Sequence, residues 1–290
     1  PEIGYYRRGK ERVGYGEETD FFTASTSGAV FGELVSASCA SLLAGHGADP
    51  GDFHFVEIGA ESAGGILAGV KHPFARASVI KLGDALSFSG RCVVFSNELF
   101  DAQPCRSFVR RGPAWLEIGV GEKDGALVEV ELGPVTAPWL PSECAEGYRF
   151  DAPRAAADFA GLIARQPWTG LFVAMDYGKS HAELAESCPE GTLRAYHRHT
   201  QGNDLLSCPG EQDLTCHVCW DWIRSALDSA GFGSVRLESQ EAFFVEHAGD
   251  FIARSIAAEA ERLSRRKLSL LQLLHPAHLG QKFQALHAYR

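Results

Sequence analysis

Two acidic residues, Glu98 and Asp101, stand three positions apart in the stretch FSNELFDAQP, directly after the apolar run Cys92–Phe95. A short, β-rich run that ends abruptly in Asn, Glu and Asp is typical of a buried strand that delivers polar groups to its carboxyl end. Because carboxylates only accept hydrogen bonds, a pair of them suits a cationic group with several donors. A second interpretation stays open, in which Asn97 and Asp101 cap a following helix and Glu98 faces solvent.

A glycine-rich stretch, GAESAGG (Gly59–Gly65), follows the apolar run FHFVEI (Phe53–Ile58). Glycines at a strand-to-helix turn let the backbone approach a nucleotide, although the dinucleotide pattern G-x-G-x-x-G is not matched. Glu57, at the end of the strand, suits a cationic or hydroxyl-bearing ligand better than a phosphate. The alternative is that the glycines only permit close helix packing.

Six potential metal ligands fall within one short polar stretch: His197, His199, Cys208, Cys216, His217 and Cys219. The CHVC segment has the two-residue spacing that suits tetrahedral zinc. A single C-x-x-C pair is weak evidence, so we assign no metal ligand. A structural zinc site stays the alternative.

The hydrophobic pattern predicts the elements that must position these residues, and it mixes helices with short, buried strands. This mixture favours an α/β fold with an open, largely parallel sheet. Strands are expected at Phe53–Ile58, Ser78–Leu82, Arg91–Phe95 and within GLFVAMDYG (Gly170–Gly178), with a hairpin at Ala114–Val120 and Ala126–Leu132. Helices are expected at Phe21–Leu43, capped by Ser25 or Ser27, and at Ile66–Val70, Ala155–Arg165, Trp220–Ala230 and Phe251–Leu274.

Composition narrows the class of protein. The chain has 290 residues, of which 45% are hydrophobic and 22% charged, which is ordinary for a globular protein. The net charge of −10 argues against a nucleic-acid binder that relies on a basic face. Eight scattered cysteines do not form a disulfide framework and favour a reducing compartment. No apolar run is long enough to predict a membrane span.

The chain begins at Pro1, without a charged and then apolar leader. We therefore expect a trimmed or processed terminus and see no targeting signal.

Five segments, in order, resemble a known family. They are GYYRRGKERVGYGEETDFFTASTSGAVFGELV, VEIGAESAGGIL, VVFSNELFDAQPCRSFV, FVAMDYG and GTLRAYHRHTQGNDLLSCPGEQDLTCHV, and the later HLGQKFQAL fits as well. Together they resemble the MidA-like family of S-adenosyl-L-methionine (SAM)-dependent methyltransferases. That family includes the mitochondrial arginine methyltransferase that assists respiratory complex I assembly. The resemblance runs from Gly4 to about Gln240.

The resemblance implies a Rossmann-like class I methyltransferase sheet with added helical segments, and SAM as cofactor. It implies an N-terminal segment, residues 1–44, that covers the cofactor site, and a Rossmann-like domain over residues 45–290. A cytoplasmic location is expected in bacteria and the mitochondrial matrix in eukaryotes. The oligomeric state stays open, a homodimer included.

The resemblance also implies site residues. The N-terminal motif of the family matches Tyr5, Tyr6, Asp20, Phe21 and Thr23, and a later strand end matches Asp176, Tyr177 and Gly178. For cofactor binding the expected residues are Glu57, Gly59, Ala60, Asp84, Asn97, Phe22 and Thr23. Asp84 is the only acidic residue between the glycine-rich turn and NELFDA, so we expect it to accept a hydrogen bond from the ribose or the adenine amino group.

The implied activity is methylation of a protein side chain, with arginine expected and a respiratory-complex subunit as one candidate partner. Glu98 and Asp101 are the expected catalytic residues, because paired carboxylates can hold a guanidinium and orient one nitrogen. The alternative is a catalytically degenerate member that serves as an assembly or interaction module. The turn GAESAGG favours this alternative, because the family has a turn like GAGRGTL there.

Overall fold

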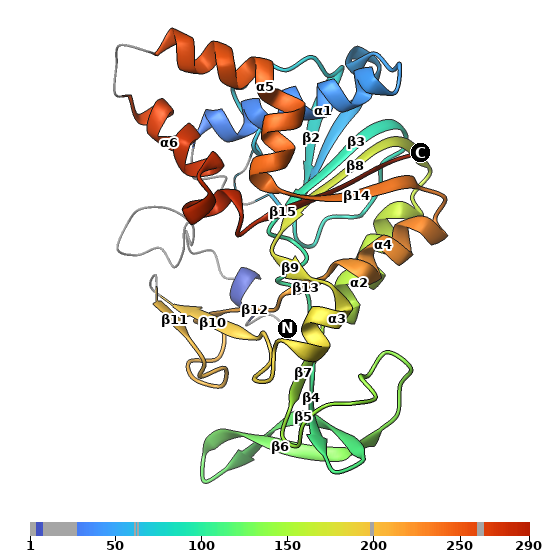
Figure 1. The fold of residues 1–290 in the computed structure, drawn as a ribbon, viewed down its shortest axis with the longest axis vertical. Helices are drawn as coiled ribbons and strands as arrows, with labels where there is room; N and C mark the ends of the chain where they lie inside the picture. Colours follow the sequence, from blue (N-terminus) through green and yellow to red (C-terminus); the bar gives the residue numbers. More distant parts are fainter. Residues whose placement is uncertain (1–3, 8–27, 61, 63, 198–199, 260–263) are drawn as a thin grey trace. The chain divides into compact units, whose positions relative to one another are not determined.

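A computed structural model describes residues 4–7, 28–60, 62, 64–197, 200–259 and 264–290 of the chain (Figure 1). The chain forms two compact units, each assembled from segments that are separated in sequence. Unit 1 comprises Pro1–Phe21, Phe100–Ala160 and Gly178–Ala226, and unit 2 comprises Phe22–Leu99, Gly161–Tyr177 and Leu227–Arg290. The expected division at residue 44 stays a prediction.

Unit 2 is built on a six-stranded sheet with the order β14-β15-β8-β3-β1-β2. The four strands β1, β2, β3 and β8 pair in parallel, whereas β15 is antiparallel to both β8 and β14. This confirms the expected open, largely parallel α/β sheet. The strands are β1 (His54–Ile58), β2 (Arg76–Ile80), β3 (Gly90–Asn97), β8 (Trp168–Asp176), β14 (Gly233–Ser239) and β15 (Gln284–Tyr289).

Three helices of unit 2 pack on this sheet and enclose its apolar core. Phe31 lies at the centre, fully buried, with its ring 6.3 Å from the ring of Phe95 and 6.2 Å from that of Phe244. Full burial of a phenylalanine stabilises a fold by about 2 to 3 kcal/mol, so this cluster anchors the helices. The helices are α1 (Ala29–Gly45), α5 (Gln240–Ala258) and α6 (Arg265–Leu274), with the short helices η3 (Pro50–Asp52) and η4 (Pro276–Gly280).

The predicted helix at Ile66–Val70 is wrong, because residues 66–69 form turns instead. Gly65 and Gly69 both have φ of +70°, a left-handed conformation that interrupts an α-helix. The connection from β1 to β2 is therefore a series of turns. The expected helical stretch Phe251–Leu274 is divided between α5 and α6, with residues 260–263 outside the described part.

Unit 1 contains a four-stranded antiparallel sheet with the order β6-β5-β4-β7. The predicted hairpin is confirmed in β5 and β6, which are joined at Asp124 and Gly125 with φ of +53° and +78°. Its elements are η1 (Tyr5–Arg7), β4 (Arg106–Arg111), β5 (Ala114–Lys123), β6 (Ala126–Val135), β7 (Arg149–Ala152), β9 (Gly178–Lys179), α3 (His181–Glu186), β10 (Arg194–His197), β11 (Thr200–Gly202), β12 (Asp213–Thr215) and β13 (Val218–Cys219). The helices α2 (Arg154–Ala164) and α4 (Trp220–Ser229) each have residues in both units.

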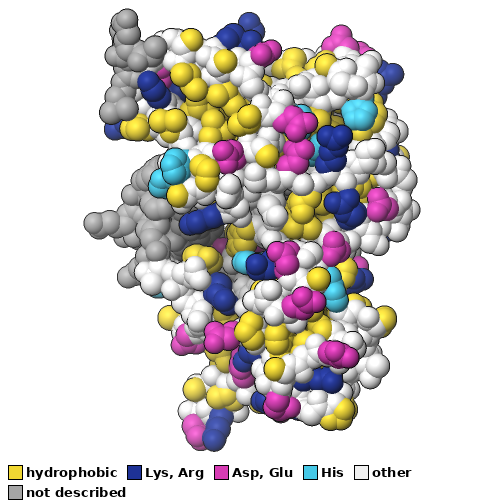
Figure 2. Space-filling model, viewed as in Figure 1, with side chains coloured by type: hydrophobic (Ala, Val, Ile, Leu, Met, Phe, Trp, Pro, Cys, Tyr) yellow, Lys and Arg dark blue, Asp and Glu magenta, His cyan; other side chains and the backbone are white. Residues whose placement is uncertain are grey.

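Acidic and basic side chains are interspersed over the face shown in Figure 2. Apolar residues are also exposed on the helices of unit 2, Ile256 on α5 and Leu268 and Leu271 on α6. Within the described residues, no helix is both long and apolar enough to cross a membrane.

Candidate functional site

The carboxyl ends of three adjacent parallel strands form one edge of the unit 2 sheet. β1 ends at Ile58, β2 at Ile80 and β3 at Asn97, and β1 lies between the other two. The chain passes from β2 across β1 to reach β3, so the strand order reverses between β1 and β3. Open α/β sheets bind their ligands outside the carboxyl ends of the strands at such a switch point.

Gly59 is the first residue after β1 and lies at this edge. Its φ is +80°, and its backbone N–H donates a hydrogen bond to the Ile80 carbonyl, 2.9 Å away. A Cβ atom at this position would lie 2.6 Å from Leu99 Cδ1. Glycine is therefore required both for the backbone conformation and for the close approach of the segment after β3.

Glu57 shapes the glycine-rich turn from within. Its side chain is buried, and Oε2 accepts a hydrogen bond of 2.7 Å from the backbone N–H of Ile66. A Cβ atom at Gly65 would collide with the same carboxylate. Glu57 thus holds the segment around Ile66 close to β1. Ala60 follows Gly59 in the turn.

Asp84 lies four residues beyond the end of β2, on an exposed turn. Its Oδ2 accepts a hydrogen bond of 2.8 Å from the backbone N–H of Lys81, and its own N–H donates to the Lys81 carbonyl at 3.0 Å. These two bonds fix the turn. They leave Asp84 at the same edge of the sheet as Gly59.

Asn97 and Glu98 form a hydrogen-bonded pair where β3 ends. Asn97 Nδ2 donates to Glu98 Oε1 at 3.0 Å, and the backbone N–H of Glu98 donates to the Met175 carbonyl at 2.9 Å. Asn97 Oδ1 is buried and accepts no hydrogen bond from the described residues. Glu98 has φ of +49°, a left-handed conformation that costs a non-glycine residue of order 1 kcal/mol and concentrates at functional sites.

Asp101 belongs to unit 1, where it is almost fully buried. Its carbonyl accepts a hydrogen bond of 2.9 Å from the backbone N–H of Cys216. In the same unit the Tyr6 hydroxyl donates to Asp213 Oδ2 at 2.9 Å, and partial burial together with the carboxylates of Asp213 and Asp101 raises the pKa of Tyr6. The interpretation in which Asp101 caps a following helix is wrong, because the next element is the strand β4.

The remaining N-terminal positions cannot be placed in the site. Phe22 and Thr23, with Asp20 and Phe21, lie outside the described residues. Tyr5 is described and is buried in unit 1. The role of Leu99, which lies within NELFDA, was not predicted from the sequence.

The cysteines of the CHVC segment are both buried in the structure. Burial raises the pKa of the Cys219 thiol to about 12. Cys216 Sγ lies 3.2 Å from Cys105 Sγ. Within the part of the chain that is described, neither Cys216 nor Cys219 belongs to a group of three potential ligands close enough for one ion.

The edge of the unit 2 sheet therefore combines three features. Gly59 allows the segment that contains Leu99 to come close to the end of β1, and Asn97 Oδ1 is a buried hydrogen-bond acceptor. Asp84, after β2, and Glu98, after β3, place one carboxylate on each side of β1. Such a set can bind a ligand that carries hydroxyl or amino donors, and can place a cationic group beside Glu98.

Comparisons with known proteins found a matching family and similar solved structures. Residues 74–236 match the family described as "Putative S-adenosyl-L-methionine-dependent methyltransferase". A crystal structure of a Burkholderia thailandensis protein bound to S-adenosylhomocysteine is similar, with a TM-score of 0.88 and 24% identity, over 100% of this chain and 84% of that chain. A native structure of a superfamily protein from the same organism has a TM-score of 0.80 and 23% identity, over 100% and 84% of the two chains. A search of curated proteins found no match.

Proposed function

We propose that this chain transfers a methyl group from SAM to an arginine side chain of a partner protein. The chain belongs to the MidA-like family of SAM-dependent methyltransferases. A subunit of a respiratory complex is one candidate partner. Membership of this family identifies SAM as the cofactor. The acceptor is our own inference from the residues at the carboxyl edge of the unit 2 sheet.

The residues at this edge fit SAM. Gly59 supplies the left-handed turn after β1 that exposes backbone groups to the methionine part of the cofactor, and a buried acceptor such as Asn97 Oδ1 needs a donor that SAM possesses. Asp84 accepts hydrogen bonds from the ribose or the adenine amino group. The similar protein from Burkholderia thailandensis was crystallised with S-adenosylhomocysteine, which supports this assignment.

Glu98 is the residue that we assign to the acceptor. When bound, SAM supplies an electrophilic methyl group on a positively charged sulfur. The chain must then hold one guanidinium nitrogen in line with that group, and most of the rate comes from positioning and electrostatic stabilisation. A carboxylate beside the cofactor can accept from a guanidinium and fix its plane. Asp101 stays a prediction as a second carboxylate.

The observation that carries this proposal is the Asn97–Glu98 pair at the switch point. One member has a buried oxygen that accepts nothing from the described residues, and the other is held in a left-handed conformation. Such strain persists only where the surrounding structure enforces it. A pair of this kind, located where α/β sheets bind ligands, favours a functional role over a structural one.

A catalytically degenerate member is the second candidate, and the turn after β1 favours it. The chain lacks the second glycine of the family's turn, and residues 66–69 form turns instead of the helix whose N-terminus would face an anionic group. In that case the same edge would serve an interaction with a partner protein.

Methyl-labelled SAM separates the two candidates. The purified protein is incubated with labelled SAM and a cell lysate, and the labelled proteins are hydrolysed to identify the methylated amino acid. We expect labelled methylarginine that is lost with Glu98→Gln. Binding of SAM without any transfer supports the degenerate candidate, and label on another amino acid contradicts the arginine assignment.

A further inference from the structure

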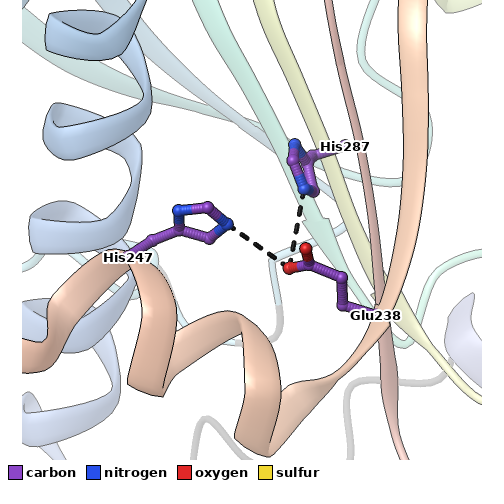
Figure 3. A group of neighbouring side chains, drawn as sticks. All are labelled: Glu238, His247 and His287. Carbon is purple, nitrogen blue, oxygen red and sulfur yellow. Dashed lines mark ion pairs between the residues drawn. The ribbon is translucent and has the colours of Figure 1, made fainter.

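A second group of polar side chains lies within unit 2, between the β14–β15 ribbon and helix α5. Glu238 is on β14, His247 on α5 and His287 on β15 (Figure 3). All three side chains point toward one another, and their ligand atoms lie within 4.8 Å of each other. None of them belongs to the candidate SAM site.

The local fold brings the three residues together. In the antiparallel pair, Glu238 lies opposite Ala285 and Arg236 opposite His287, so Glu238 and His287 are diagonal neighbours on one face. Ser239 then caps α5 by accepting a hydrogen bond from the Ala242 N–H. The helix therefore starts at Gln240, two residues after Glu238, and carries His247 back over the ribbon.

The distances match the spacing of metal ligands better than that of hydrogen bonds. His247 Nε2 lies 3.3 Å and His287 Nε2 3.7 Å from Glu238 Oε2. A charged hydrogen bond between such atoms would be about 2.7 to 2.9 Å long. In a tetrahedral zinc site with bonds of about 2.0 to 2.1 Å, neighbouring ligand atoms are about 3.3 to 3.4 Å apart.

The three atoms are also buried without hydrogen-bond partners. Glu238 Oε2, His247 Nε2 and His287 Nε2 have no solvent-exposed surface and make no hydrogen bond within the described residues. Their side chains are 15%, 9% and 6% exposed. A buried polar atom without a hydrogen-bond partner lowers the free energy of unfolding by about 1 to 3 kcal/mol. Three such atoms at one point are best explained by one bound partner that all three contact.

We propose that Glu238, His247 and His287 bind one divalent transition-metal ion, with zinc as the preferred ion and water as its fourth ligand. Two imidazoles and one carboxylate are an established donor set for zinc. Hard cations such as Mg²⁺ prefer oxygen ligands and an octahedral shell, so they do not compete here. The ion joins α5 to the last two strands of the sheet. This inference does not depend on the proposed methyltransferase function.

Zinc titration tests the site directly. Purified protein is freed of metal by a chelator and dialysis, and zinc binding is followed by calorimetry and by the melting temperature. We expect one zinc ion per chain with a dissociation constant of about 1 μM or lower, and a rise in melting temperature that Mg²⁺ does not produce. Replacement of zinc by Co²⁺ should give the visible absorption of a four-coordinate ion.

Variants separate this site from other histidines. Glu238→Gln and His247→Gln keep the approximate size of each side chain and should weaken zinc binding by about 100-fold. The control His278→Gln changes an exposed histidine whose ring lies 5.1 Å from that of His275, and it should bind zinc as wild type does. Circular dichroism confirms that each variant is folded. Wild type that binds no stoichiometric zinc, or folded Glu238→Gln that binds as tightly as His278→Gln, overturns the proposal.

Discussion

Leu99 occupies the space that a side chain at Gly59 would need, since a Cβ atom at residue 59 would lie 2.6 Å from Leu99 Cδ1. This contact joins the segments that follow β1 and β3, the two strands between which the strand order reverses. The close approach of Leu99 therefore helps to shape the carboxyl edge of these two strands. The turn after β1 (residues 59–65) and the NELFDA segment must keep their positions relative to each other for a ligand to bind.

Gly59→Ala should abolish binding of S-adenosylhomocysteine. The new side chain also costs about 1 kcal/mol or more of folding free energy, because the φ of +80° is left-handed and Leu99 is close. The double variant Gly59→Ala/Leu99→Ala relieves the contact with Leu99. If the folded double variant binds as the Leu99→Ala control does, residue 59 matters only for packing.

Asp84→Asn should weaken binding of SAM by about tenfold or more, because a charged acceptor contributes about 1.5 to 3 kcal/mol to a hydrogen bond. Asparagine retains an oxygen that can accept from the Lys81 N–H, so the turn should persist. Asp52→Asn is the matched control, since Asp52 is exposed and precedes β1 at the opposite edge of the sheet. Equal affinities in the two variants would remove Asp84 from the cofactor site.

Glu98→Gln should lower methyl transfer by a large factor and leave cofactor affinity and melting temperature unchanged. The amide keeps an oxygen that can accept from Asn97 Nδ2, but it loses the charge that orients a guanidinium. Labelling of lysate proteins by wild type and variant measures the effect. Equal labelling would show that the NELFDA segment is only a structural signature.

His217 should make the fold sensitive to acid. Burial, together with the cations Lys179 and Arg194, lowers its pKa to about 4, whereas an unfolded histidine titrates near pH ~6.5. The unfolded chain thus binds the proton first, so stability is complete above pH ~6.5 and is lost as the pH falls toward ~4, by at most about 3 kcal/mol. Urea unfolding at both pH values should show a smaller loss in His217→Gln. An identical loss in both proteins would contradict this assignment.

Local sequence patterns predicted the four parallel strands of the unit 2 sheet, but not the antiparallel strands β14 and β15. The runs before Gly59 and Asn97 became β1 and β3, and GLFVAMDYG became β8. The helix after β1 failed because the pattern of apolar residues at Ile66–Val70 does not reveal that Gly65 and Gly69 adopt left-handed conformations. At Gly65 the lack of a side chain also leaves space for the buried Glu57 carboxylate, a tertiary contact that the local pattern does not reveal.

The candidate sites differ in how far sequence could locate them. Gly59, Asp84, Asn97 and Glu98 follow strand ends, so a parallel sheet brings them to one edge. The metal site escaped because its ligands are separated by nine and forty residues and follow no spacing rule. A histidine inside the apolar strand QALHAY, His287, was the only local signal.

Calorimetric titration with S-adenosylhomocysteine tests the central claim most directly. The carboxyl edge of β1, β2 and β3 should bind one molecule per chain, with a dissociation constant of about 100 μM or lower for the wild type. The affinity should fall in Asp84→Asn and not in Asp52→Asn. A folded wild-type protein that shows no binding at millimolar ligand would contradict the assignment of this edge as a SAM site.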